Sequence, residues 1–283
     1  MDTVIVVDGD GLRSDPGRPL LHADDLGVLH GDGVFETMLV RDGRARLVRR
    51  HLARLVDGAA RLDLPEPDVE RIARAVETAQ DAWSGTGDGA LRIVYTRGRE
   101  SDPGSPTWFV TVSPVPERAA IARRDGVTVL LLTRAQDPDA VAPWELAGAK
   151  ALSYARNTAA LRHARAQGFD DAIYLSSTGT VLESPRANVV ALFDGVLTAT
   201  PAADGILAGT TQEALYAAAD RAGVPTREAR MTPEDLRGAD GVWLLSSLTL
   251  AARVRRMGDF VLAETPNRAG LVPKLVTEAI TRP

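Results

Sequence analysis

Residues 34–48 read VFETMLVRDGRARLV, and this stretch predicts a β-hairpin. The Asp-Gly pair at positions 42–43 is a turn that two-residue hairpins favour, and strand-like runs flank it on both sides. Successive strand side chains point to opposite faces, so Phe35 and Thr37 are expected on one face and Glu36 on the other. A threonine on a largely apolar face is either a choice of β propensity or a proton donor in a pocket.

The segments around this hairpin predict a small α+β domain over residues 1–115. A helix is expected directly after the hairpin, because apolar residues at 48, 52, 55, 59 and 62 share one helical face. Residues 67–83 are predicted to form a second helix. Residues 90–98 and 107–115 read as two more strands.

The rest of the chain predicts a second, larger domain over residues 126–283. Few pattern signals occur just before it, so we expect an interdomain linker at 116–125. A helix is expected from about 150 to 167, and another begins after the AGTT motif at 208–211. The runs with strand character are residues 127–133, 172–177, 188–193, 196–200 and 241–247.

Composition excludes several classes of function. The 283 residues carry a net charge of −5 with no long block of like charge, so we expect neither nucleic-acid binding nor a polybasic membrane anchor. The absence of cysteine excludes disulfides and thiol catalysis, and four scattered histidines give a metal site little support. No apolar run reaches a membrane span and the N-terminal apolar run is short, so a cytoplasmic protein is expected.

Lys150 is one of only two lysines in the chain. It lies among small residues in GAKALSYARN, where partial burial would lower the pKa of its amine and suit it to form a Schiff base. The alternative is a solvated lysine at the start of a helix. Lys274, the other lysine, lies on a predicted C-terminal helix and is the weaker candidate.

Other segments suggest groups that would bind an anion or a ring nitrogen. Thr210 and Thr211 begin a helix, whose N-terminal N–H groups suit a phosphate, although a threonine could equally cap that helix. Arg54 could bind a phosphate through its guanidinium or lie solvated on its helix. Glu183 ends an apolar strand, where it could face a cofactor's pyridine nitrogen or be a surface acid.

Taken together and in order, these motifs resemble one family, the fold-type IV pyridoxal-phosphate enzymes. The resemblance covers roughly residues 20–256 and rests on HGDGVFET, HLARL, GAKALSYARN, VLESPRANV, GILAGTTQEAL and VWLLSSLTLAARV. It implies that Lys150 is the Schiff-base lysine and that Glu183 pairs with the pyridine nitrogen of pyridoxal 5′-phosphate. It also implies a phosphate site and a contact to the ring hydroxyl. The residues implied there are Arg54, Thr210, Thr211 and Ser247 for the phosphate and Tyr154 for the hydroxyl.

Within that family, GDGVFET followed by VRDG is most similar to aminodeoxychorismate lyase, where the threonine that matches Thr37 is suggested to assist proton transfer. D-Amino acid aminotransferases carry an Arg-x-His pair after the TRG strand, and this chain has no histidine there. Branched-chain aminotransferases read FEG at the hairpin. The chain departs from the usual GITR phosphate loop, because Gln212 stands in place of the arginine.

The resemblance implies two α/β domains, the larger with a β-barrel-like core, with the cofactor in the cleft between them. It implies a lyase that converts 4-amino-4-deoxychorismate into 4-aminobenzoate and pyruvate in folate biosynthesis, acting as a homodimer on a small-molecule substrate. An aminotransferase for D-amino acids or branched-chain amino acids is the first alternative. The second is a non-catalytic protein that binds a phosphorylated ligand at the GTT motif.

Overall fold

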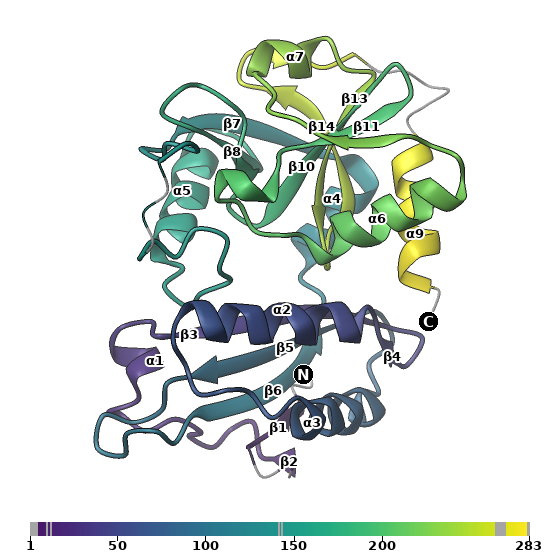
Figure 1. Cartoon of the computed structure of the whole chain (residues 1–283). Helices are drawn as coiled ribbons and strands as arrows, with labels where there is room; N and C mark the ends of the chain where they lie inside the picture. The colour runs from purple at the N-terminus through teal and green to yellow at the C-terminus, as the bar shows by residue number, and fades with distance from the viewer. Residues whose placement is uncertain are drawn as a thin grey trace. The chain divides into compact units, whose positions relative to one another are not determined.

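The computed structural model describes residues 5–9, 11, 13–140, 142, 144–263 and 270–281, and it has a mixed α/β fold with two sheets (Figure 1). The chain divides into two compact units. Unit 1 comprises Met1–Pro116 and the returning segment Ala149–Tyr154, and unit 2 comprises Glu117–Gly148 and Ala155–Pro283. Lys150 therefore belongs to unit 1, although its position in the sequence placed it in the predicted second domain.

Unit 1 is built on a six-stranded sheet in the order β2-β1-β6-β5-β3-β4. Every neighbouring pair in this sheet is antiparallel. The strands are β1 (Ile5–Val7), β2 (Arg13–Ser14), β3 (Gly33–Arg41), β4 (Arg44–Ala45), β5 (Gly89–Thr96) and β6 (Thr107–Pro114).

The predicted hairpin is confirmed as β3 and β4. Asp42 and Gly43 connect the two strands, with φ angles of 53° and 69°. Positive φ at both central residues matches the twist of antiparallel strands, which is why Asp-Gly is favoured there. The hairpin strand β3 also pairs with β5 from Gly33 to Val40, so it lies inside the sheet, between β5 and β4.

Two helices cover one face of this sheet, as the apolar spacing predicted. They are α2 (Val48–Arg61) and α3 (Val69–Ala82), and a four-residue helix α1 (Leu26–Leu29) precedes β3. Leu52 and Leu55 of α2 join Val34 and Met38 of β3 in one buried apolar cluster, to which α3 also contributes. The alternate residues of β3 point to the opposite face of the sheet, away from these helices.

The segment Ala149–Tyr154 forms main-chain hydrogen bonds with β3. The Phe35 N–H donates to the Lys150 carbonyl at 3.0 Å, and the Leu152 N–H donates to the Gly33 carbonyl at 2.8 Å. The predicted helix from residue 150 is therefore wrong at its start, and α5 spans Ala155–Ala166. Groups that bond to a neighbouring strand are not available for a helical ladder, so the chain is not helical here, and Ala151 forms a β-bridge with Val34.

Unit 2 contains a nine-stranded sheet in the order β12-β11-β10-β13-β14-β7-β8, with β15 on β14 and β9 on β10. Three of its pairs are parallel, namely β11–β12, β14–β7 and β7–β8. The strands are β7 (Val127–Thr133), β8 (Asp171–Leu175), β9 (Glu183–Ser184), β10 (Ala187–Phe193), β11 (Val196–Ala199), β12 (Thr226–Glu228), β13 (Gly241–Ser246), β14 (Leu250–Met257) and β15 (Phe260–Val261).

The residues predicted to form a linker are helical. Helix α4 spans Glu117–Asp125, and it buries Ala119 and Ala122. Its sequence has little helical periodicity beyond these alanines, which explains why pattern reasoning missed it. The other helical elements of unit 2 are η1 (Ala202–Asp204), α6 (Thr210–Arg221), α7 (Pro233–Arg237) and α9 (Leu271–Thr281). Helices α6 and α9 pack together, and α9 and α4 both pack on β14.

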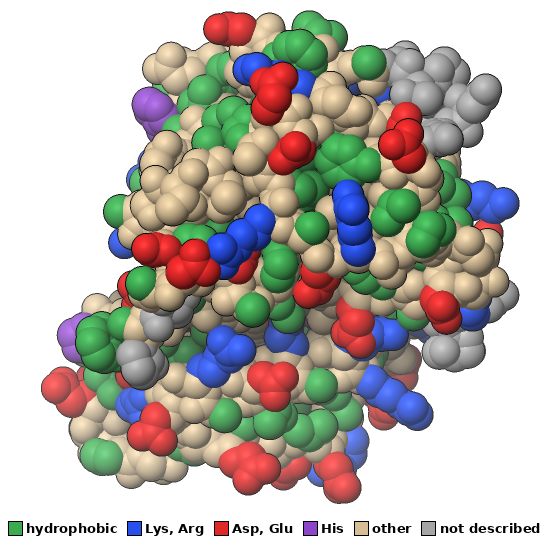
Figure 2. Space-filling model, turned by 45° about the horizontal axis from the view of Figure 1, so that its top comes forward, with side chains coloured by type: hydrophobic (Ala, Val, Ile, Leu, Met, Phe, Trp, Pro, Cys, Tyr) green, Lys and Arg blue, Asp and Glu red, His purple; other side chains and the backbone are tan. Residues whose placement is uncertain are grey.

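The surface agrees with the composition. Basic and acidic side chains are interspersed on the face that Figure 2 shows. Within the described residues, no helix has both the length and the apolar character that crossing a bilayer requires.

Gly33→Ala tests the pairing that holds the lysine segment. A Cβ at this position would lie 2.5 Å from the Tyr95 carbonyl oxygen and 2.9 Å from the Thr96 Cα, so the backbone must shift. We expect the free energy of unfolding, measured by urea titration, to fall by about 1–3 kcal/mol. Gly87→Ala is the control, because nothing lies within 4 Å of its Cβ, and it should change stability by less than about 0.5 kcal/mol. Equal stability of the two variants would contradict the packing described.

Candidate active site

The side chain of Phe35 connects the lysine with other residues of unit 1. The Lys150 Nζ lies 4.5 Å from the centroid of the Phe35 ring. The Tyr154 ring meets the same ring edge-on, with centroids 5.6 Å apart. Lys150 is half-buried, as its small neighbours predicted. A cation this close to an aromatic face is attracted to it, so Phe35 helps to fix the position of the amine.

Thr37 lies on the same face of β3 as Phe35, two residues further along the strand. It is half-buried, and Arg92 of β5 stands directly opposite it in the sheet. The Arg92 guanidinium carbon is 5.8 Å from the Phe35 ring centroid. This face of unit 1 therefore combines a lysine, a threonine hydroxyl, a tyrosine and an arginine around one phenylalanine.

Arg54 is held by a buried carboxylate on the other face of β3. Glu36 is fully buried and accepts hydrogen bonds from the Arg54 Nε at 2.7 Å and the Arg54 Nη2 at 2.8 Å. The Nδ1 of His51, which is also buried, lies 2.7 Å from the same carboxylate. Both His51 and Arg54 come from α2, three residues apart on adjacent turns. The alternative of a solvated helix arginine is excluded, because the Arg54 side chain is only 13% exposed.

The charges in this network follow from their surroundings. Burial alone would raise the pKa of Glu36, but Arg54 and His51 outweigh it and hold that pKa at about 2. Burial lowers the pKa of His51, against the effect of the Glu36 carboxylate. At neutral pH Glu36 is therefore ionised and His51 is neutral. Since a carboxylate can only accept, the His51 Nδ1 must carry the proton.

Sequence reasoning missed this network, although one signal was present. Glu36 alternates with Val34 and Met38 on the face of β3 that faces the helices. A carboxylate placed among core residues is costly unless it is paired, so its partners had to come from the helix that covers this face.

In unit 2, the predicted residue Glu183 bonds to the loop that leads to α6. The Leu207 N–H donates to the Glu183 carboxylate at 3.1 Å. The Asn188 side-chain amide donates to the Leu207 carbonyl at 2.7 Å, and Asn188 is the strand partner of Glu183. Both main-chain groups of Leu207 are thus held by β9 and β10, which places Glu183 beside the predicted phosphate loop.

The N-terminus of α6 has the features of an anion site. Gly209 is the N-cap and provides no side-chain hydrogen bond, so the idea that a threonine caps this helix is wrong. Thr210 and Thr211 are both buried within the first turn. A Cβ on Gly209 would collide with the Asn188 side chain, so the loop needs glycine here. Free N–H groups at a helix N-terminus, together with hydroxyls, favour a phosphate.

Ser247, the remaining predicted phosphate ligand, is half-buried in the turn between β13 and β14. The neighbouring Ser246 and Thr249 hydroxyls bond to each other, and the Ser246 Oγ also accepts the Thr249 N–H at 3.1 Å. This turn is therefore ordered by its own side chains. The structure places the predicted residues in two groups, with Lys150, Tyr154, Thr37 and Arg54 in unit 1 and the others in unit 2.

The residues present suit pyridoxal phosphate. Unit 2 has an uncapped helix N-terminus with buried hydroxyls for a phosphate, and a carboxylate beside it for a protonated ring nitrogen. Unit 1 has a half-buried lysine for the imine. Among the described residues, no group of three or more His, Asp and Glu side chains could hold a metal ion.

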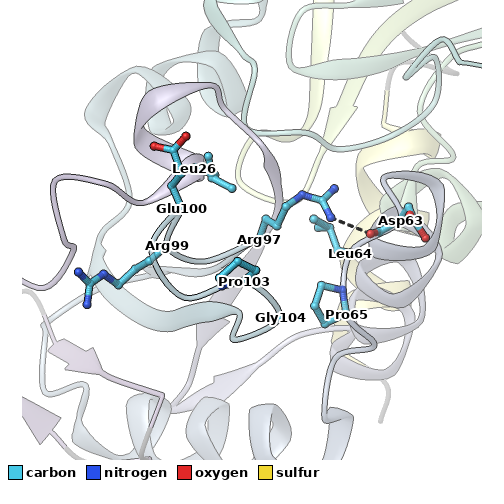
Figure 3. A pocket seen from close by; sticks show the side chains of 9 residues that line it. All are labelled: Leu26, Asp63, Leu64, Pro65, Arg97, Arg99, Glu100, Pro103 and Gly104. Atoms are coloured by element: carbon cyan, nitrogen blue, oxygen red, sulfur yellow. Dashed lines mark hydrogen bonds between the residues drawn. The ribbon is translucent and has the colours of Figure 1, made fainter.

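A hollow of about 530 Å³ on unit 1 contains none of the predicted site residues (Figure 3). Its two arginines are engaged, because Arg97 pairs with Asp32 at 2.6 Å and Arg99 pairs with Asp24 at 3.0 Å. The residues that line it are Leu26, Asp63, Leu64, Pro65, Arg97, Arg99, Glu100, Pro103 and Gly104.

Comparison with known proteins agrees with this geometry. The profile of the family described as amino-transferase class IV matches residues 33–257. A bifunctional aminodeoxychorismate lyase / D-amino acid transaminase of Mycobacterium tuberculosis is 48% identical over 98% of each chain. A solved structure of a hypothetical aminotransferase from Mycobacterium tuberculosis, in its PLP-bound form, superimposes with a TM-score of 0.95, at 49% identity and 98% coverage of each chain.

The chain belongs to the class IV aminotransferase family. It has the fold of the fold-type IV enzymes, and its cofactor is pyridoxal 5′-phosphate. A 4-amino-4-deoxychorismate lyase from Pseudomonas aeruginosa shares the fold, with a TM-score of 0.75 at 28% identity over 98% of this chain and 97% of that one. The family, fold and cofactor predicted from the sequence are thus confirmed.

Glu36→Ala tests the buried network. Removing one partner of a buried ion pair leaves the other charge uncompensated, which typically costs about 3–5 kcal/mol. We expect the free energy of unfolding to fall by that amount in denaturant titration. Glu234→Ala removes an exposed pair in which the Glu234 side chain is 79% and the Arg237 side chain 44% exposed, and it should cost no more than about 1 kcal/mol. Similar losses in both variants would show that the Glu36 network adds no special stability.

Proposed function

We propose that this enzyme is a 4-amino-4-deoxychorismate lyase that releases 4-aminobenzoate and pyruvate. The observation that carries the proposal is the position of Thr37 on the same sheet face as Phe35, whose ring contacts Lys150. The sheet face that presents Phe35 to the Lys150 amine therefore also presents the Thr37 hydroxyl, which is suited to donate a second proton, to the departing group. The 48% identity to a relative named for both lyase and D-amino acid transaminase activity supports the same assignment.

In this proposal each group of residues has one task. Lys150 would hold the cofactor through its amine, and as a free amine it would remove the proton from the substrate carbon that carries nitrogen. Phe35 and Tyr154 keep the lysine amine in place between these steps. Glu183 holds the proton on the pyridine nitrogen. The phosphate is bound by Arg54, Thr210, Thr211 and Ser247, and Tyr154 also contacts the ring hydroxyl.

Bound pyridoxal phosphate supplies an electron sink that lets this carbon lose its proton. The Thr37 hydroxyl donates a proton toward the departing enolpyruvyl group, which leaves as pyruvate. Loss of this group makes the six-membered ring aromatic, so the reaction needs no keto acid. The Arg54 guanidinium is oriented for its task by the bidentate bond to Glu36.

D-Amino acid transamination is the second candidate function. The relative that is 48% identical is named for it as well, and Lys150 serves the first step of both reactions. The segment after the TRG motif contains no histidine that could join an arginine in binding the substrate carboxylate. This absence favours the lyase as the principal activity.

The release of 4-aminobenzoate from 4-amino-4-deoxychorismate, measured without any keto acid, tests the proposal. We expect multiple turnovers from the wild type and none from Lys150→Ala. Lys274→Ala, which changes the other lysine, should keep full activity. Borohydride reduction followed by peptide mapping should find the cofactor on Lys150. Cofactor on Lys274, or turnover of D-alanine with no release of 4-aminobenzoate, would overturn the assignment.

Thr37→Val tests the role of the threonine. Loss of a positioned acid typically lowers the rate by about 10²–10⁴-fold, so kcat for the lyase reaction should fall by that factor. Thr37→Ser keeps the hydroxyl and should retain most of the activity. The first half-reaction with D-alanine, followed by cofactor absorbance, should be nearly unchanged in both variants. An equal loss in both reactions would show that Thr37 acts only through packing.

A further inference from the structure

Helix α4 contacts the turn that carries Ser247 through one arginine. The Arg123 Nε–H donates a hydrogen bond to the Leu248 carbonyl at 2.7 Å, across 125 positions in the chain. Both residues are half-buried, and α4 also packs on β14, the strand that follows the turn. A helix that carries no predicted site residue therefore bonds directly to the turn that holds one.

The neighbouring arginine shows what is unusual about this bond. Arg124 pairs with Asp125, the next residue in the chain, at 2.7 Å, and the two side chains are 70% and 46% exposed. An exposed pair of this kind contributes little and is typical of a protein surface. Arg123 bonds instead to a main-chain carbonyl in another part of unit 2. Hydrogen bonds from a charged donor are stronger than those between neutral groups, so Arg123 fixes the position of the Leu248 carbonyl.

The bond from Arg123 completes the restraint on one peptide group of the turn. A peptide group is planar, so the Leu248 carbonyl and the Thr249 N–H belong to one rigid unit. The Thr249 N–H donates to the Ser246 Oγ at 3.1 Å, while the Leu248 carbonyl accepts from Arg123. Because both of its polar groups are bound, this peptide group cannot rotate without breaking a hydrogen bond.

The turn also contains backbone strain. Leu250, which pairs with Ser246 where the two strands meet the turn, has a φ angle of 56°. This left-handed conformation is unfavourable for a residue with a bulky side chain, and it persists only where surrounding contacts hold it. Arg123 supplies such a contact from outside the hairpin. Ser247 lies between Ser246, at the end of β13, and the restrained peptide group, so its main chain is held from both sides.

We propose that Arg123 is a positioning residue, which holds this turn in the conformation in which Ser247 binds the phosphate of the cofactor. The inference rests on the phosphate role proposed for Ser247. A donor that is already ordered loses less entropy when it binds its ligand, so a restrained turn binds a phosphate more tightly than a mobile one. The hydrogen bond carries the effect, and not the positive charge of Arg123, since the Nε–H is directed at the Leu248 carbonyl.

Titration of the full chain, freed of cofactor, with pyridoxal phosphate and with pyridoxal tests this role. The two probes differ only by the phosphate, so the ratio of their affinities isolates its contribution, and a general loss of stability would weaken both alike. Arg123→Met and Arg123→Gln are a matched pair, because both side chains end near the position of the arginine Nε but only glutamine keeps an N–H donor there. A hydrogen bond to a charged group contributes roughly 10–100-fold in affinity. We expect Arg123→Met to lower the ratio by this factor and Arg123→Gln to retain most of it.

Two further variants provide the control and the coupling. Arg124→Met changes an exposed arginine of the same helix and should leave both affinities unchanged. Ser247→Ala should lower the ratio by the same factor as Arg123→Met, and the double variant should lose no more than either single one, since both act on one contact. Additive losses, an unchanged ratio in Arg123→Met or Ser247→Ala, equal losses in Arg123→Met and Arg123→Gln, or a loss in Arg124→Met would each overturn the role of Arg123.

The outcome for Arg123 can be separated from that for the proposed lyase. The titrations need no turnover, so the expected ratios would support the role of Arg123 even without any release of 4-aminobenzoate. Conversely, normal release of 4-aminobenzoate together with the same affinity ratio in the wild type and in Arg123→Met would overturn that role and leave the proposed reaction standing.

Discussion

The short main-chain pairing between β3 and residues 150–152 is the constraint on which the reactive side of unit 1 depends. It joins residues more than a hundred positions apart in the chain and places the Lys150 backbone beside Phe35. An isolated lysine side chain has many rotamers, and ordering it is entropically costly. The paired backbone and the adjacent aromatic ring restrict the amine to the sheet face that also holds Thr37 and Arg92.

The two faces of β3 have different tasks because strand side chains alternate. One face packs on α2 and α3, and it includes the buried Glu36 that binds Arg54 and His51. The other face presents Phe35 and Thr37. A shift of one residue in the register of β3 would exchange these faces, so the eight paired positions between β3 and β5 determine both the core and the chemistry.

In unit 2, main-chain hydrogen bonds hold the loop that leads to α6. The N–H and carbonyl of Leu207 are bound by Glu183 and Asn188. These bonds couple the carboxylate proposed for the pyridine nitrogen to the loop before α6. A helix N-terminus can bind an anion through its N–H groups, and Gly209 at the N-cap of α6 has no side chain that could cap them.

The sequence by itself determined the hairpin at 42–43, the apolar face of α2, most strands of both sheets, the family and the cofactor. These depend on periodicity and turn chemistry, which are local, or on motifs whose order is visible in the chain. It predicted a linker where α4 lies and a helix at Lys150 where the chain is not helical. Only the tertiary structure decided that residues 149–154 return to unit 1, that Glu36 holds Arg54, and that Arg92 stands opposite Thr37. Such contacts join distant segments, and their pairing is set by burial and strand register, which no local pattern records.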